Sequence, residues 1–323
     1  MLELLLVFAV AFAFTFITIP WIMPKLKRRG LTGKDRNKPS LPETPEMGGF
    51  GIIAGFSAGV LVAVALFTFP FFELNLNLGL ITILAALSTI LIMAIIGVID
   101  DLFSINQLVK ASIPLFAAMP LVAVKAGETT MALPFIGSID FGIWYALLLI
   151  PIGIAGASNV TNMLEGFNGL GAGMGIVACT SLAFIAWKTG SHEALIILIA
   201  MIGALLAFFY YNFKGKIFMG DIGTLSIGAV IACSVIIGNF ETAGVIVIIP
   251  YALDFIIKAK NRFPSSDWWG TYKDGKLTCP GKPVGLCQLI MKFTGGISEK
   301  NLVLSLIGIE LIFGIIAVMI YGI

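Results

Sequence analysis

Residues 78–101 read LGLITILAALSTILIMAIIGVIDD: an apolar run over 78–99 is followed at once by the pair Asp100-Asp101. The run carries no charge, and it is long enough to cross the hydrocarbon core of a bilayer as one helix of about 20 residues. Similar apolar runs recur along the chain, separated by Pro, Gly and charged residues. The sequence therefore predicts an all-α polytopic membrane protein.

The composition supports the same fold class. Of the 323 residues 59% are apolar and 12% are charged, about half the charged share that is usual in soluble domains. These values exclude a soluble enzyme, a nucleic-acid-binding domain and a disordered protein. The four cysteines form no C-x-x-C pair, so neither a disulfide framework nor a zinc site is indicated.

Ten membrane spans account for most of the chain, and together they make one integral membrane domain over residues 1–323. We place them at residues 4–24, 48–69, 78–99, 111–124, 142–158, 169–187, 194–211, 223–239, 243–257 and 300–321.

The charged residues then fix the orientation. Alternate loops, at 25–47, 100–110, 159–168, 212–222 and 258–299, hold 18 of the 20 Lys and Arg residues when Lys300 at the membrane edge is included. The positive-inside rule makes these loops cytoplasmic and puts both termini outside, in a multi-pass protein of the cell membrane. In the outer segment 125–141 the residues around Pro134 and Gly137 predict a small β-hairpin.

The cytoplasmic loops carry the residues that could do chemistry. Asp100 and Asp101 close the third span, where two carboxylates are unfavourable because a helix C-terminus is the negative end of the dipole. They either simply end the helix or take part in a catalytic or metal site. The single His192 falls in an outer loop, so chemistry at the cytoplasmic face must proceed without an imidazole.

Two further segments are polar beside the membrane. Asn159-Val-Thr-Asn162-Met-Leu-Glu165-Gly-Phe-Asn168-Gly follows the fifth span. It is either a polar cap on the next helix or a set of amide ligands for a cation or a nucleobase. Phe218-Met-Gly-Asp221 follows the seventh span. Asp221 is either the N-cap of the next helix or a ligand of Mg²⁺ at a helix N-terminus that faces a phosphate.

Carboxylates, amides and basic residues at one membrane face suit phosphoryl transfer from a soluble phosphate ester to a lipid phosphate. A secondary transporter with a cation site is the main alternative, although it would place polar groups near the bilayer midplane and show an internal repeat. A structural scaffold and a CDP-alcohol phosphotransferase are further alternatives. The last would need a multi-Asp signature that this sequence lacks.

Three motifs carry a family resemblance: the Asp100-Asp101 pair, Asn159-x-x-Asn162-x-x-x-Gly166-x-Asn168-Gly, and Phe218-x-Gly-Asp221. In this order and spacing they resemble the polyprenyl-phosphate N-acetylhexosamine-1-phosphate transferases. That resemblance implies transfer of a sugar 1-phosphate, GlcNAc 1-phosphate in the first instance, from a UDP-sugar to a polyprenyl or dolichyl phosphate. UMP is released, and Mg²⁺, or Mn²⁺ in its place, is required.

The resemblance also implies roles for single residues. Asp221 and Asn162 are expected to bind the metal ion. Asp100 and Asp101 are expected to position or deprotonate the acceptor phosphate and to support the metal and Lys110. We favour direct attack by the acceptor over an aspartyl intermediate, because a phosphate monoester is already an anionic nucleophile.

The same comparison assigns the donor side. Phe218, Gly166 and Asn168 are expected to frame the uracil, and Lys110 and Arg262 to neutralise phosphate oxygens.

The branch of the family follows from other residues. Leu41-Pro-Glu43-Thr and Asp274-Gly-Lys276-Leu resemble the eukaryotic dolichyl-phosphate GlcNAc-1-phosphate transferase and its archaeal relatives. Glu43 and Asn159 are therefore added to the substrate-binding set. The last cytoplasmic loop departs from the family pattern, because Asn261 stands where other members have a histidine. The expected partners are the UDP-sugar, the lipid phosphate, the bilayer and a second copy in a homodimer, with no nucleic acid.

Overall fold

The computed structural model describes residues 2–69, 79–103, 106–133, 137–264 and 269–321. Its helices are α1 (Leu2–Arg28), α2 (Gly49–Thr68), α3 (Leu80–Phe103), α4 (Gln107–Ala117), α5 (Met119–Ala123), α6 (Ile150–Leu164), α7 (Leu170–Thr189), α8 (His192–Asn212), α9 (Gly220–Gly238), α10 (Glu241–Lys260), α11 (Leu286–Phe293) and α12 (Glu299–Tyr321). A π-helical turn, Tyr145–Leu149, leads into α6.

Three short antiparallel hairpins complete the fold: β1 (Thr32–Lys34) with β2 (Glu43–Pro45), β3 (Thr130–Leu133) with β4 (Gly137–Asp140), and β5 (Thr271–Lys273) with β6 (Lys276–Thr278). The hairpin β3–β4 confirms the hairpin predicted within 125–141, while Pro134 itself lies outside the described residues.

Within the described ranges, nine helices are long and apolar enough to cross a membrane. They confirm the all-α polytopic prediction and match nine of the ten predicted spans. The fourth predicted span, 111–124, falls on α4 and α5, whose apolar stretch Val109–Ala123 is shorter than the others. Pro114 inside α4 and Pro120 at the start of α5 cannot donate helical hydrogen bonds, which explains why this segment is broken.

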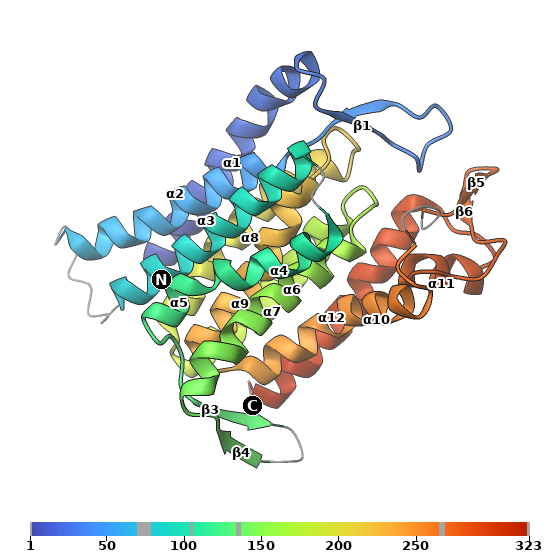
Figure 1. Ribbon diagram of the computed structural model, residues 1–323. Helices are drawn as coiled ribbons and strands as arrows, with labels where there is room; N and C mark the ends of the chain where they lie inside the picture. Colours follow the sequence, from blue (N-terminus) through green and yellow to red (C-terminus); the bar gives the residue numbers. More distant parts are fainter. Residues whose placement is uncertain (1, 70–78, 104–105, 134–136, 265–268, 322–323) are drawn as a thin grey trace.

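The helices form a bundle whose two ends differ (Figure 1). The hairpins β1–β2 and β5–β6 and helix α11 lie at one end, and the hairpin β3–β4 and the C-terminus lie at the other. We call the end with β1–β2 the basic end, because the loops with nearly all Lys and Arg residues gather there.

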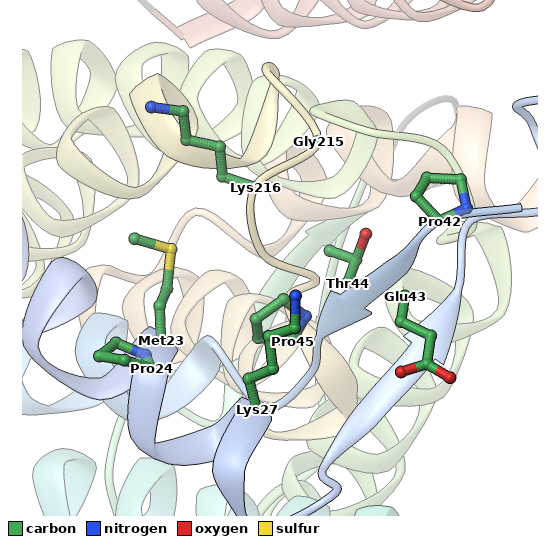
Figure 2. Close-up of a pocket in the computed structure, with 9 residues that line it drawn as sticks. All are labelled: Met23, Pro24, Lys27, Pro42, Glu43, Thr44, Pro45, Gly215 and Lys216. Atoms are coloured by element: carbon green, nitrogen blue, oxygen red, sulfur yellow. The ribbon is translucent and has the colours of Figure 1, made fainter. Parts of the chain in front are cut away.

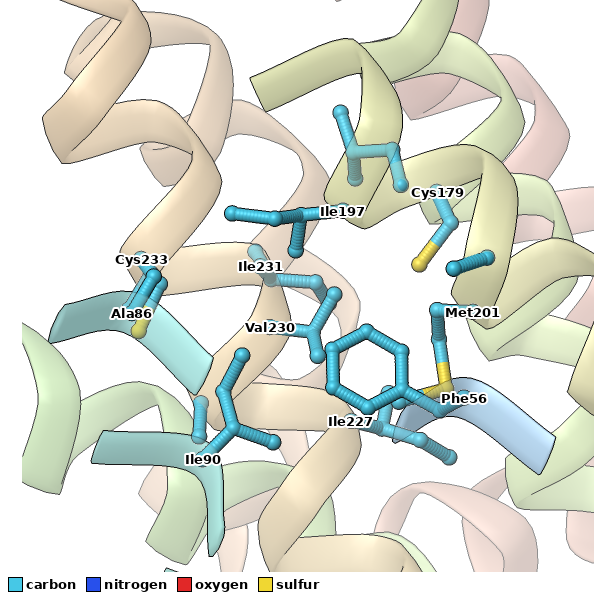
Figure 3. Close-up of a cluster of buried hydrophobic side chains, with 14 of the residues drawn as sticks. Phe56, Ala86, Ile90, Cys179, Ile197, Met201, Ile227, Val230, Ile231 and Cys233 are labelled. Carbon is cyan, nitrogen blue, oxygen red and sulfur yellow. The ribbon is translucent and has the colours of Figure 1, made fainter. Parts of the chain in front are cut away.

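Helices α8 and α9 are the most buried of the long helices, and α9 packs against α3 on one side and α6 on another. Figure 3 shows apolar side chains of neighbouring helices meeting those of α9, among them Phe56 of α2, Ile90 of α3, Met201 of α8 and Ile227 of α9. Lipid tails are as apolar as these side chains, so close packing rather than exclusion of water holds such a bundle together.

A glycine sets the closest approach of α6 to α9. A Cβ atom at Gly228 of α9 would lie 2.4 Å from the Ala157 carbonyl oxygen and 2.5 Å from Ser158 Cα, both on α6. The backbones therefore touch one turn before Asn162. Any larger residue at this position must push the two helices apart.

We expect Gly228→Ala to lower the free energy of unfolding in detergent by about 1–3 kcal/mol, because the added methyl group meets backbone that cannot move away. Gly308→Ala is the matched control, since a Cβ atom there meets nothing within 4 Å. Thermal unfolding of both variants measures the difference. Equal melting temperatures would show that the α6–α9 contact tolerates separation.

Candidate active site

An ion-pair cluster joins three helices at the basic end. Lys110 of α4 donates a hydrogen bond from Nζ to Asp221 Oδ2 of α9 at 2.5 Å, and it also forms an ion pair with Asp100 Oδ2 of α3. Asp100 is buried, and the side chains of Lys110 and Asp221 are about a quarter exposed or less. One ammonium group therefore holds together two carboxylates that would otherwise repel each other.

Asn162 adds a fourth helix to this cluster. Its side-chain amide from α6 satisfies both neighbours in the orientation in which the nitrogen donates to Asp221 Oδ1 and the oxygen accepts from Lys110 Nζ, each at 3.1 Å. Oxygen atoms of Asp100, Asp221 and Asn162 thus surround a single cation. The structure brings together the residues that the sequence predicted for the metal and the acceptor phosphate.

Asp101 has a different role from its neighbour. Its carboxylate accepts hydrogen bonds from the backbone N–H groups of Asp221 at 2.9 Å and Ile222 at 3.4 Å, so it caps the first turn of α9. Gly220 permits this approach, because it has φ +72° and a Cβ atom there would lie 2.6 Å from Asp101 Oδ2. The positive end of the α9 dipole thus compensates the second carboxylate of the pair.

This geometry removes one alternative for Asp221. The helix begins at Gly220, and Asp221 lies in its first turn with its own N–H donated to Asp101. Asp221 is therefore not the N-cap of α9. Its side chain faces Lys110 and Asn162 instead.

The oxygen atoms around Lys110 are of the kind that a hard divalent cation prefers. Among the described residues no three His, Cys, Asp or Glu side chains group closely enough to hold an ion by themselves. A metal site here would therefore need the amide oxygen of Asn162 beside the carboxylates. The donor set fits Mg²⁺ once the Lys110 ammonium moves aside.

A second polar cluster surrounds the loop between α6 and α7. Asn168, which is buried, donates from its side chain to Asp35 Oδ2 at 2.9 Å and to Glu299 Oε1 at 2.8 Å. The Gly166 carbonyl oxygen accepts a hydrogen bond from Asn37 at 2.9 Å. We call Asp35, Asn37, Asn168 and Glu299 the amide cluster. It unites the first cytoplasmic segment, the α6–α7 loop and the start of α12.

Backbone hydrogen bonds join Phe218 to the segment from the end of β2 to the start of α2. Its N–H donates to the Pro45 carbonyl oxygen at 2.8 Å, and its own carbonyl oxygen accepts from Gly48 N–H at 2.9 Å. The hairpin β1–β2 is thereby fastened to the loop before α9. The Phe218 side chain is half-buried, and the residue stands three positions before Asp221 in the sequence.

Among the described residues, no ion pair joins Glu43 to either cluster. Glu43 is exposed on β2 and lines a separate cavity of about 460 Å³ together with Lys27 and Lys216. Figure 2 shows the Glu43 carboxyl and the Lys216 ammonium pointing in different directions. The predicted contact of Glu43 with substrate stays a prediction.

Asn159 and Arg262 are also not joined to the clusters by hydrogen bonds between described residues. Asn159 donates to the Ala155 carbonyl oxygen of its own helix at 2.8 Å. Arg262 is exposed in a turn with φ +60°, and its guanidinium has no ion pair with any described residue. Their predicted roles remain predictions.

Sequence reasoning missed Asp35, Asn37, Glu299 and Glu46. The first two lie in a run of alternating charges that reads as solvated surface, yet both are buried. Burial and the nearby Asp101 raise the pKa of Glu46, which adds a further acid beside the ion-pair cluster. The only available signal for Glu299 was its place in Gly-Ile-Ser-Glu-Lys-Asn, directly before the last span.

The bundle and its charged clusters define a multi-pass membrane protein with a polar, ion-paired site at one end. The sequence pattern of glycosyl transferase family 4 matches residues 83–239, which include Asp100, Asn162 and Asp221. The chain belongs to this family.

Relatives extend the match over the whole chain. A Sulfolobus acidocaldarius protein, provisionally named a UDP-N-acetylglucosamine–dolichyl-phosphate N-acetylglucosaminephosphotransferase, is 38% identical over 98% of this chain and 96% of its own length. A Saccharolobus solfataricus protein with the same provisional name has the same identity and coverage. The Dictyostelium discoideum enzyme of that name is 26% identical over 91% of this chain and 82% of its own length.

Glu165, in the α6–α7 loop, provides a test of the burial of this region. Its Oε2 atom is buried without a hydrogen-bond partner among the described residues. Burial raises the pKa of this carboxyl group from 4.5 to about 7, although the Gly171 N–H opposes the shift. Between pH 4.5 and about 7, therefore, the Glu165 carboxyl group is protonated in the folded protein but ionised in the unfolded chain.

We expect the stability of the wild type to fall by up to about 3 kcal/mol as the pH rises from 5 to 8. Glu165→Gln should abolish this part of the pH dependence, and the exposed-site control Glu128→Gln should keep it. Melting temperatures of the three proteins across this range measure the effect. A Glu165→Gln variant that keeps the wild-type slope would show that the carboxyl group is hydrated.

Proposed function

We propose that this protein transfers N-acetylglucosamine 1-phosphate from UDP-N-acetylglucosamine to dolichyl phosphate or a related polyprenyl phosphate. An oxygen of the acceptor phosphate attacks the β-phosphorus of the donor. The bond from that phosphorus to the bridging oxygen breaks, and UMP leaves with this oxygen. The product is the lipid with a diphosphate-linked sugar. Family membership and the names of the relatives favour this reaction over the transporter alternative.

One observation supports the proposal most strongly: an apolar groove lies along α6, whose C-terminal end carries Asn162. The groove has a volume of about 410 Å³ and is lined mainly by α6, α9 and α10. It extends from Tyr145, in the π-helical turn before α6, to Val160, two residues before Asn162 in the sequence. Apart from Tyr145 and Glu241, its side chains are apolar. We propose that a polyprenyl tail occupies this groove with its phosphate towards the basic end.

The ion-pair cluster suits an acceptor of this kind. Lys110 offers an ammonium group to phosphate oxygens, and Asp100 holds that ammonium in place. We propose that Asp221 and Asn162 hold Mg²⁺, which when bound supplies the positive charge that lets one phosphate approach another. Asp101 acts as a positioning residue, because it fixes the first turn of α9 and with it the Asp221 side chain.

The orientation in the membrane is part of the proposal. Nearly all Lys and Arg residues lie at the basic end, so this end should face the cytoplasm, where the nucleotide sugar is made available. The cell membrane is the proposed location. A homodimer remains a prediction.

We expect Asp221→Asn to lower the rate of UMP release by roughly 100-fold, because a neutral amide cannot replace the charge that holds a cation at the reacting phosphates. The assay uses purified protein in detergent with UDP-N-acetylglucosamine, dolichyl phosphate and Mg²⁺. Asp140→Asn, on β4 at the opposite end, is the control and should keep full activity. Near wild-type turnover by Asp221→Asn at low Mg²⁺ would refute the proposed site.

A further inference from the structure

Glu299, in the first turn of α12, accepts three hydrogen bonds at one oxygen. Its Oε1 atom receives the backbone N–H of Asn168 at 2.9 Å, the side-chain amide of Asn168 at 2.8 Å and that of Asn37 at 3.4 Å. All three donors belong to Asn168 and Asn37, the two asparagines of the amide cluster.

These contacts determine which way each amide points. The Asn168 nitrogen faces carboxylate oxygens of Asp35 and Glu299, and an ionised carboxylate can only accept. The Asn37 nitrogen faces the Gly166 carbonyl oxygen and Glu299, which are also acceptors. Neither amide can turn around without facing oxygen to oxygen. Both are therefore fixed with their Oδ1 atoms directed away from the carboxylates.

The two Oδ1 atoms are left without donors. Asn37 and Asn168 are each 5% exposed, and their Oδ1 atoms are buried with no hydrogen-bond partner among the described residues. Buried acceptors without partners are unfavourable and rare in folded proteins. Two of them occur in this one network, and they require donors that the described residues do not supply.

We propose that Asp35 and Glu299 are positioning residues that fix Asn168 as an acceptor for the N3–H group of uracil, and so set the base preference of the enzyme. This inference rests on the proposed UDP-sugar donor. A rigid acceptor can distinguish ligands only if the ligand's donor or acceptor character at that atom is also fixed. A hydroxyl group fails this condition, because it can rotate to suit its partner. A base edge meets that condition. Uracil has a donor at N3, whereas cytosine has an acceptor there.

Glu299→Gln tests the inference, because it removes one of the two carboxylates that hold the Asn168 nitrogen, and the new amide can donate to Asn168 Oδ1. The equilibrium binding of UMP and of CMP is measured by calorimetry on the full-length protein. We expect the preference for UMP over CMP to fall roughly tenfold relative to wild type. Asp35→Asn should act in the same direction if Glu299→Gln fails to fold.

Glu193→Gln is the matched control. Glu193 is likewise in the first turn of its helix and accepts a backbone N–H, from Gly79 at 2.7 Å, but it lies at the start of α8, and the full length of α7 separates it from Asn168. It should keep the wild-type preference. An equal loss of UMP and CMP binding in Glu299→Gln, or no loss of either, would overturn the inference. Wild-type protein that binds no UMP and releases none would instead refute the proposed function.

Discussion

The ammonium of Lys110 is the contact on which the basic end of the bundle depends. It lies between Asp100 and Asp221 and also donates a hydrogen bond to the Asn162 oxygen, so it joins α3, α4, α6 and α9. Removing one partner of such a buried group leaves an uncompensated charge, which costs far more than the pair itself contributes. The short, Pro-interrupted helix α4 is thereby held against three long helices that belong to the core.

Two polar clusters lie near the C-terminal end of α6, and each contains different chemical groups. The ion-pair cluster collects the charges suited to phosphates. The amide cluster collects hydrogen-bonded asparagines and carboxylates around the α6–α7 loop. The contact of α6 with α9 at Gly228 holds together the two helices that carry Asn162 and Asp221.

The sequence predicted those features that depend on local pattern. Apolar runs of bilayer length give the long helices, and the unfavourable carboxylates at the end of residues 78–101 marked a real charge cluster. It could not show that Asp101 rather than Asp221 caps α9, since that depends on how closely α3 approaches Gly220. The burial of Asp35 and Asn37 could not be predicted either, because it depends on contacts with Gly166 and Asn168, more than 100 positions away.

We propose that Asp221 and Asn162, beside Asp100, form a cation site that the Lys110 ammonium occupies when no metal ion is bound. Titration of Mn²⁺ into purified wild-type protein and Lys110→Met, followed by electron paramagnetic resonance, tests it most directly. Without the competing ammonium, the two carboxylates should bind Mn²⁺ roughly tenfold more tightly or better, and Mg²⁺ should displace it. Unchanged or weaker Mn²⁺ binding by Lys110→Met would contradict the claim.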